Sequence, residues 1–102
     1  MERKYKNSVP WEDILIRQLQ DEEFARDFLN DCFIEYVNGG NFNTFFKSLE
    51  RVIKARMSVT QFAKEAEIDR TNLYALFNGK KKPQLKTVLK ILSKLGYTLR
   101  IA

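Results

Sequence analysis

The sequence predicts an all-α fold of six short helices that closes with a short C-terminal β-strand. Two observations support this prediction. Apolar residues recur at spacings of three and four along most of the chain, which is the period of an amphipathic helix. Residue types that start and end helices separate these apolar stretches. With 102 residues, of which 44% are hydrophobic, the chain can form one packed domain or one domain with an appended subdomain.

The first two helices are expected within residues 9–40. Pro10 suits the first turn of a helix, and apolar residues follow it at helical spacing as far as Leu19. Asp21 is placed to cap a second helix, which ends at residues 38–40 because glycine readily adopts a left-handed C-cap. The apolar face of this second helix consists of Phe24, Phe28, Leu29, Cys32, Phe33 and Tyr36.

The third helix is expected to start near Asn41 or Asn43 and to run to about Arg56. Its apolar residues are Phe42, Phe45, Phe46, Leu49, Val52 and Ile53. The segment from Ser58 to Gln61 has the spacing of a capping box and therefore starts a fourth helix.

Residues 58–83 have the pattern of two short helices joined by a tight turn. The apolar residues that would pack these helices across each other are Phe62, Ala63, Ala66, Ile68, Leu73 and Leu76. Asp69 is placed to cap the second of the two helices, which therefore begins with Arg70, Thr71 and Asn72. This is the helix-turn-helix pattern, in which the second helix enters the major groove of DNA.

The chain after this pattern predicts a sixth helix and a strand. The fifth helix stops at residues 78–79, and the sixth begins after Pro83 and stops at Gly96. Its apolar residues are Leu85, Val88, Leu89, Leu92 and Leu95. Residues 97–102 alternate strictly and predict a strand, whose apolar face is Tyr97, Leu99 and Ile101. A lone strand has unpaired backbone groups, so we expect it to pair with a second copy or another protein. The alternative is a tail that only packs its apolar side chains.

The residues expected to contact DNA follow from the helix-turn-helix pattern. The first turn of its second helix faces the base edges, where Arg and Asn make bidentate contacts. We therefore expect Arg70, Thr71 and Asn72 to contact bases. Tyr74, one turn later, could pack its ring at the edge of the motif while its hydroxyl reaches a phosphate. Gln61, at the start of the preceding helix, is placed to reach a phosphate or a base edge.

Three lysines follow the fifth helix, in the loop where the DNA backbone would pass. Lys80, Lys81 and Lys82 are expected to contact phosphates, although lysine runs are more often simply solvated surface. Phosphate contacts of this kind lower the affinity in salt, with a log-log slope of about −0.9 per phosphate. Since one such domain buries little DNA surface, we expect a homodimer and consider the terminal strand its seam.

The net charge of +5 is distributed unevenly along the chain. Residues 11–40 contain eight acids and two arginines, whereas residues 41–102 contain thirteen Lys/Arg and four acids. The basic part coincides with the predicted DNA-binding helices, as a phosphate-binding surface requires. The acidic part is expected to face away from DNA.

The composition argues against an enzyme. The chain has no histidine and one cysteine, so it has no internal disulfide and no Cys/His zinc site. The commonest general base is missing, and no glycine-rich phosphate loop is found. We expect no catalysis, no metal and no cofactor. Cys32 lies on an apolar helix face and is expected to be a buried small hydrophobe.

Three regions are expected from these patterns. Residues 1–8 are polar and form a flexible tail, residues 9–40 form an acidic N-terminal helical extension, and residues 41–102 form the helix-turn-helix DNA-binding domain with its C-terminal strand. No apolar run approaches the length of a membrane span, and the first residues lack a signal-peptide pattern. A cytoplasmic protein without a membrane partner is expected.

The residues described above resemble a known family. Residues 62–96 resemble the λ-repressor-like helix-turn-helix class, and residues 8–101 resemble the addiction-module antidote proteins, the antitoxin partners of small toxins with a RelE-like fold. The features that carry the narrower resemblance are Val9 to Asp13, Leu15-Ile16, Phe28-Leu29-Asn30, Thr60-Gln61, Asp69 to Tyr74, Asn78-Gly79, Pro83 and Leu95 to Ile101.

The resemblance implies the antitoxin of a type II toxin–antitoxin module. Such a protein binds its RelE-like toxin and, as a dimer, represses its own operon by binding double-stranded operator DNA. The positions it implies for DNA contact are Gln61, Arg70, Thr71, Asn72 and Tyr74. The alternatives are a stand-alone helix-turn-helix repressor without a toxin and a protein-interaction module that does not bind DNA.

Two regions acquire further meaning from the resemblance. RNA-cleaving RelE-like toxins are strongly basic, so the acidic residues 11–37 could contact the toxin, or could simply complete the core. Glu67 departs from the class, which often has glycine at the bend before Ile68. A non-glycine residue there must adopt a strained or differently shaped turn.

Overall fold

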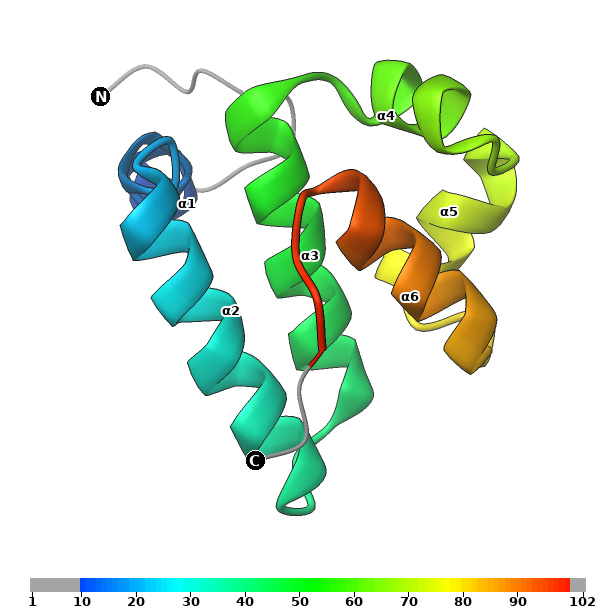
Figure 1. Ribbon diagram of the computed structural model, residues 1–102, viewed down its shortest axis with the longest axis horizontal. Helices are drawn as coiled ribbons and strands as arrows, with labels where there is room; N and C mark the ends of the chain where they lie inside the picture. Colours follow the sequence, from blue (N-terminus) through cyan, green and yellow to red (C-terminus); the bar gives the residue numbers. More distant parts are fainter. Residues whose placement is uncertain (1–9, 100–102) are drawn as a thin grey trace.

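The computed structural model describes residues 10–99, which form six α-helices and, over that range, no strand (Figure 1). The all-α class is therefore confirmed for the described residues. The helices are α1 (Pro10–Gln18), α2 (Glu22–Val37), α3 (Phe42–Arg56), α4 (Val59–Ala66), α5 (Arg70–Phe77) and α6 (Leu85–Lys94). None of these helices is long and apolar enough to cross a membrane.

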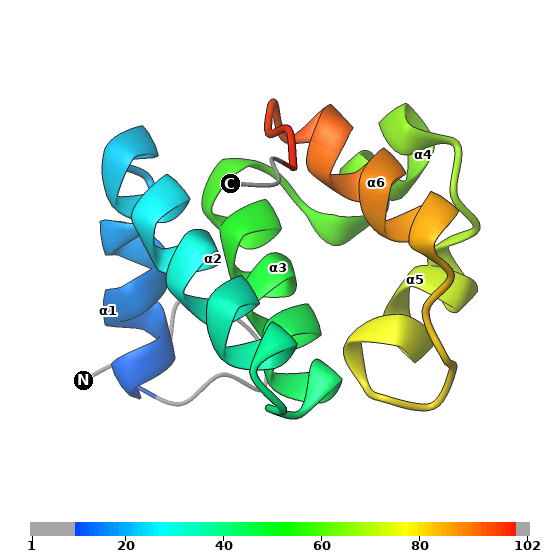
Figure 2. The same ribbon diagram turned by 60° about the horizontal axis from the view of Figure 1, so that its bottom comes forward.

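Helix α3 lies at the centre of the molecule. Helices α1 and α2 pack on one side of it and α4 and α5 on the other, with α6 against α4 (Figures 1 and 2). Three side chains of α3, Leu49, Val52 and Ile53, are completely buried. The buried core is continuous from Leu19, before α2, to Leu95, after α6. The same helix therefore supports both sides of the molecule.

The predicted caps fix where three of the helices begin. Asp21, Ser58 and Asp69 each accept a hydrogen bond from the backbone N–H three residues later, at 3.1, 3.1 and 3.0 Å. A cap of this kind stabilises a helix by about 1 kcal/mol. Asn41 caps α3 by accepting a hydrogen bond from the N–H of Asn43, two residues later, at 2.7 Å, so α3 begins at Phe42. The predicted starts of α2, α3, α4 and α5 are thus confirmed.

The turn between α4 and α5 has left-handed backbone at Glu67, with φ +56° and ψ +43°. Glu67 is the only non-glycine residue with positive φ between residues 10 and 99. Its N–H and that of Ile68 bond back to carbonyls at the end of α4, and Lys90 of α6 donates a hydrogen bond to the Glu67 carbonyl at 3.2 Å. The strained turn expected for a non-glycine residue is confirmed, and a side chain in this conformation costs about 1–2 kcal/mol.

Glu67→Gly is therefore expected to raise the free energy of unfolding. Glycine adopts positive φ without strain, but it also increases the entropy of the unfolded chain, so the net gain should be about 0.5–1 kcal/mol. Glu67→Gln is the matched control, because it removes the charge and keeps the strain. Urea unfolding followed by circular dichroism measures both variants. Equal stability of Glu67→Gly and Glu67→Gln would contradict a strained turn.

The predicted C-terminal strand is not seen. Residues 97–99 have no regular secondary structure, and Ile101 lies outside the described residues, as does the predicted tail of residues 1–8. The Tyr97 N–H donates to the Leu92 carbonyl at 2.8 Å, and Arg56 donates to the Tyr97 hydroxyl at 2.9 Å. The first bond closes the turn after α6, and the second joins Tyr97 to α3. Neither belongs to a strand ladder.

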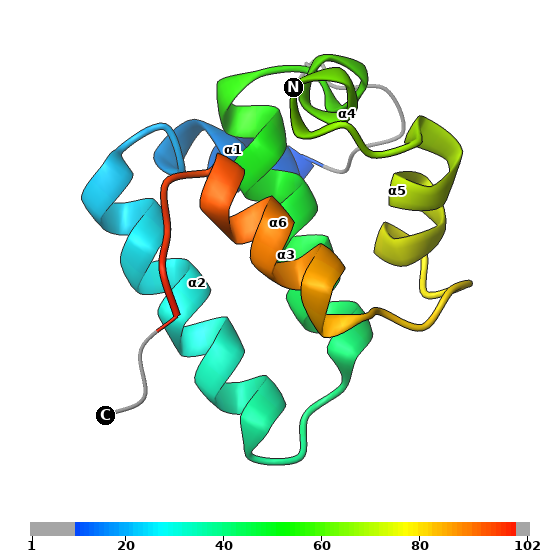
Figure 3. The same cartoon turned by 45° about the vertical axis from the view of Figure 1, so that its right-hand side comes forward.

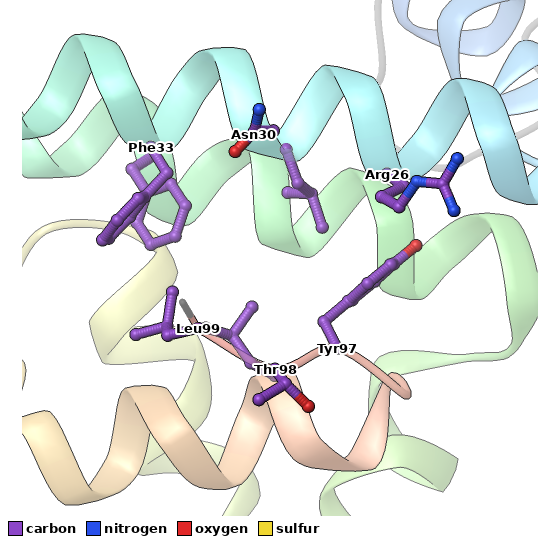
Figure 4. Close-up of a pocket in the computed structure, with 9 residues that line it drawn as sticks. Arg26, Asn30, Phe33, Tyr97, Thr98 and Leu99 are labelled. Carbon is purple, nitrogen blue, oxygen red and sulfur yellow. The ribbon is translucent and has the colours of Figure 1, made fainter. Parts of the chain in front are cut away.

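Residues 97–99 instead lie between α2 and α6 (Figure 3). A cavity of about 100 Å³ is lined by residues 97–99 and by α2 residues that include Arg26, Asn30 and Phe33. Figure 4 shows these two segments on opposite sides of the cavity, with the Tyr97 ring pointing toward α2 and the Thr98 side chain pointing away from it. Within the described residues, this end of the chain thus packs its apolar side chains on the body of the molecule. It corresponds to the alternative of a packed tail.

Candidate nucleic-acid interface

Helix α5 separates its apolar and polar side chains onto two faces. Leu73, Leu76 and Phe77 are buried and hold the helix against α3 and α4. The four residues predicted to contact DNA from this helix are exposed: Arg70, Thr71, Asn72 and Tyr74, the last with 38% of its surface accessible. A helix anchored in this way presents its first turn to a ligand without moving.

Gln61 lies in the first turn of α4, and its side chain is exposed. Its backbone N–H is bound by the Ser58 hydroxyl, so the start of α4 is fixed. The side of α4 that carries Phe62, Ala63 and Ala66 is buried. The Gln61 side chain is therefore accessible to a ligand. Gln61 does not line the hollow described below.

The loop after α5 is tied to α3. Lys47 of α3 donates a hydrogen bond to the side-chain oxygen of Asn78 at 3.1 Å. Gly79 has φ +73°, and a Cβ there would overlap the Asn43 side chain of α3. These contacts fix the start of the loop that carries the exposed lysines 80–82. The lysine run is thereby held beside α5.

A hollow of about 330 Å³ lies between the start of α5 and α6, and we call it the α5–α6 hollow. Its lining residues are Glu67, Ile68, Asp69, Asn72, Leu76, Lys81, Lys82, Gln84, Lys86, Thr87 and Lys90. Of the residues predicted to contact DNA, the structure brings Asn72, Lys81 and Lys82 together here. The lysines of α6, Lys86 and Lys90, were not predicted from the sequence, although their spacing of four within the expected sixth helix was an available signal.

The acidic residues of the N-terminal part fall into two groups: those that are buried or bound to other groups of the protein, and those that are exposed without an ion pair among the described residues. Asp13 is buried, Glu12 forms an ion pair with Arg51 at 3.3 Å, and Asp21 caps α2. Among residues 10–99, no ion pair involves the remaining acids, all of which lie exposed on α2: Glu22, Glu23, Asp27, Asp31 and Glu35.

Four of these acids form a row along α2. Glu23, Asp27, Asp31 and Glu35 follow each other at intervals of four residues, so they are neighbours on one stripe of the helix, and we call them the acidic row. Like charges at this spacing destabilise a helix by about 0.2–0.5 kcal/mol per pair. Ile34, 49% exposed, lies next to the row. Along α2 the molecule therefore has an acidic and partly apolar surface that its own described residues do not neutralise.

Fold and surface together define a small all-helical protein with a basic polar region around α5 and α6 and an acidic one along α2. Residues 13–102 match the model of the protein family described as probable addiction module antidote protein. The match spans most of the chain, so the chain belongs to this family. An antidote counteracts a toxin, and membership therefore implies a toxin partner. Neither the curated proteins nor the solved structures gave a match to this chain.

Proposed function

We propose that this protein is the antitoxin of a type II toxin–antitoxin module. It neutralises a RelE-like toxin by direct binding and, as a homodimer, represses its own operon by sequence-specific binding to double-stranded DNA. It acts in the cytoplasm by binding alone, without catalysis. The observation that carries the proposal is the separation of charge between the acidic row of α2 and the lysines around α5.

The DNA-binding half of the proposal rests on α4 and α5. The two helices are joined by a turn of three residues, and the exposed first turn of α5 carries Arg70, Thr71 and Asn72. These are side chains with the hydrogen-bonding groups that read base edges in the major groove. The lysines beside them supply the positive charge that the DNA backbone requires.

The toxin-binding half of the proposal rests on the acidic row. An arrangement of three successive like-charge pairs destabilises α2 by about 0.6–1.5 kcal/mol at the usual value per pair, with no compensating ion pair among the described residues. A basic partner surface would turn this repulsion into attraction and would also speed association. Exposed Ile34 adds apolar area within the same surface. A strongly basic toxin is the partner that fits this surface.

The double variant Asp27→Asn and Asp31→Asn tests the toxin surface. Each exposed ion pair contributes about 0.7 kcal/mol, so losing two should weaken binding about tenfold. The fold should become slightly more stable, because like-charge repulsion within α2 falls. The measurement is the dissociation constant for the product of the adjacent reading frame, by calorimetry, together with the thermal midpoint of the free protein.

Glu65→Gln is the control, because Glu65 is an exposed acid on α4, away from the row. It should leave the affinity for the adjacent product unchanged. Equal losses in the control and in the double variant would contradict a specific role of the row. If the wild-type protein does not bind the adjacent product but still shifts upstream DNA, the stand-alone repressor replaces the antitoxin.

A further inference from the structure

The α5–α6 hollow gathers four lysines from two segments of the chain. Lys81 and Lys82 come from the loop, and Lys86 and Lys90 come from successive turns of α6. No ion pair within residues 10–99 involves any of them. Lys86 and Lys90 are spaced by four residues on α6, so they are neighbours on one side of the helix and repel each other. The hollow thus concentrates positive charge that no ion pair within the described residues neutralises.

The position of Lys90 is set by the turn that precedes α5. Its ammonium group donates a hydrogen bond to the Glu67 carbonyl at 3.2 Å, which holds it at the rim of the hollow. Lys86 is exposed, one turn closer to the start of α6. Lys94 continues the same spacing but does not line the hollow. The α6 lysines therefore fall into two that face the hollow and one that does not.

The start of α6 adds backbone donors to the same place. Gln84, the N-cap residue, makes no side-chain cap hydrogen bond, and Gln84, Lys86 and Thr87 all line the hollow. The first amide groups of a helix carry the positive end of the helix dipole, although the Thr87 N–H already donates to the Gln84 carbonyl at 3.0 Å. With about 330 Å³, the hollow can hold a phosphate group together with water molecules, each of which occupies about 30 Å³ in the liquid.

Two acids also line the hollow, and they do not cancel its charge. The Asp69 carboxylate accepts the Asn72 N–H at 3.0 Å and so is engaged as the cap of α5. Glu67 is exposed at the turn. Four lysines against two carboxylates leave the hollow positive. Asn72 of α5, one of the residues proposed to contact bases, lines the same hollow. A ligand bound in the hollow therefore lies directly beside α5.

We propose that the α5–α6 hollow binds a phosphodiester group of the DNA backbone, held by Lys86 and Lys90 of α6 together with the loop lysines. The proposal rests on the DNA binding proposed above and extends it to a second helix. The bound phosphate fixes how α5 enters the groove, while Arg70, Thr71 and Asn72 discriminate between sequences. Since phosphates are the same in every sequence, the α6 lysines contribute equally to all DNA.

The test compares Lys86→Gln with Lys94→Gln, two equal charge changes on one helix. Fluorescence anisotropy measures binding to a duplex from upstream of the gene and to a duplex of unrelated sequence, over a series of salt concentrations. Lys86→Gln should reduce the magnitude of the log-log salt slope by about 0.9 on both duplexes, as expected for one lost phosphate contact. Lys94→Gln should leave the slope unchanged.

Two results would overturn the proposal while the DNA-binding function stands. If the salt slope changes equally in Lys86→Gln and Lys94→Gln, the lysines act only through the general positive charge of α6. If the slope is unchanged in Lys86→Gln, Lys86 does not contact a phosphate. Lys90→Gln is a second, independent test of the α5–α6 hollow and should also reduce the magnitude of the salt slope. If the wild-type protein binds neither duplex, the proposed DNA-binding function itself fails, and the phosphate contact with it.

Discussion

A Phe46→Ala variant is expected to lose about 3–5 kcal/mol of unfolding free energy, the range for truncating a fully buried phenylalanine. Phe46 lies on α3, is 1% exposed and packs its ring edge-on against Phe42 and Phe45. Small domains have only about 5–15 kcal/mol of stability in total. Because α3 supports both α2 and α5, the variant should weaken the proposed toxin binding and the proposed DNA binding together.

Phe24→Ala is the matched control for this prediction. Phe24 lies in the first turn of α2 and is 40% exposed, so its truncation removes few core contacts and should destabilise the protein by less than about 1 kcal/mol. Urea unfolding followed by circular dichroism gives both values. A loss in Phe46→Ala no larger than that in Phe24→Ala would mean that α3 is not the shared support of the two sides.

Local sequence signals were sufficient to predict where the helices begin and end. A cap such as Asp69 needs only the N–H groups of the next three residues, so its spacing is visible in the sequence. The apolar period likewise predicted the buried side of α5, where Leu73 and Leu76 are buried as expected. It was wrong for Leu85 and Leu89 of α6, which are exposed although they lie on the predicted apolar face. The departure at Glu67 was also recognisable, because left-handed backbone at a tight turn favours glycine.

Features that depend on contacts between distant residues were not predictable in the same way. The C-terminal segment alternates like a strand, but Arg56, 41 residues before Tyr97, binds its hydroxyl and helps hold it on the helical body. An alternating pattern records which side chains are apolar, and a packed tail and a strand share that pattern. The cavity between residues 97–99 and α2 exists only once those segments meet.

The candidate surfaces were predictable in outline. The sequence placed acids before residue 41 and lysines after it, but only the structure separates engaged acids, such as Glu12, from free ones. Lys86 and Lys90 were not predicted because they lie outside the helix-turn-helix pattern. Only the folded chain brings them to the same hollow as Asn72. Charge counts treat every residue alike, whereas a binding surface depends on which charges remain unpaired.

An Arg70→Ala variant is expected to weaken binding to the upstream duplex by about 1–3 kcal/mol, since that is the discrimination a bidentate contact to guanine provides. This corresponds to roughly 5- to 150-fold in the dissociation constant. Arg70 is exposed in the first turn of α5, at the positive end of the helix dipole, and the acid at this end of the helix is the N-cap Asp69. Removing a cation from the positive end of a helix dipole favours the helix, so we expect the variant to remain folded, which circular dichroism checks.

Binding to the duplex of unrelated sequence distinguishes residues that contact bases from residues that contact the phosphate backbone. Arg70→Ala should lose affinity chiefly for the upstream duplex, whereas Lys86→Gln should weaken binding to both duplexes equally, because base contacts discriminate and phosphate contacts do not. Arg17→Ala, an exposed arginine of α1, is the control and should change neither affinity. Equal losses on both duplexes in Arg70→Ala would assign Arg70 to the phosphate backbone and leave Thr71 and Asn72 as the reading residues.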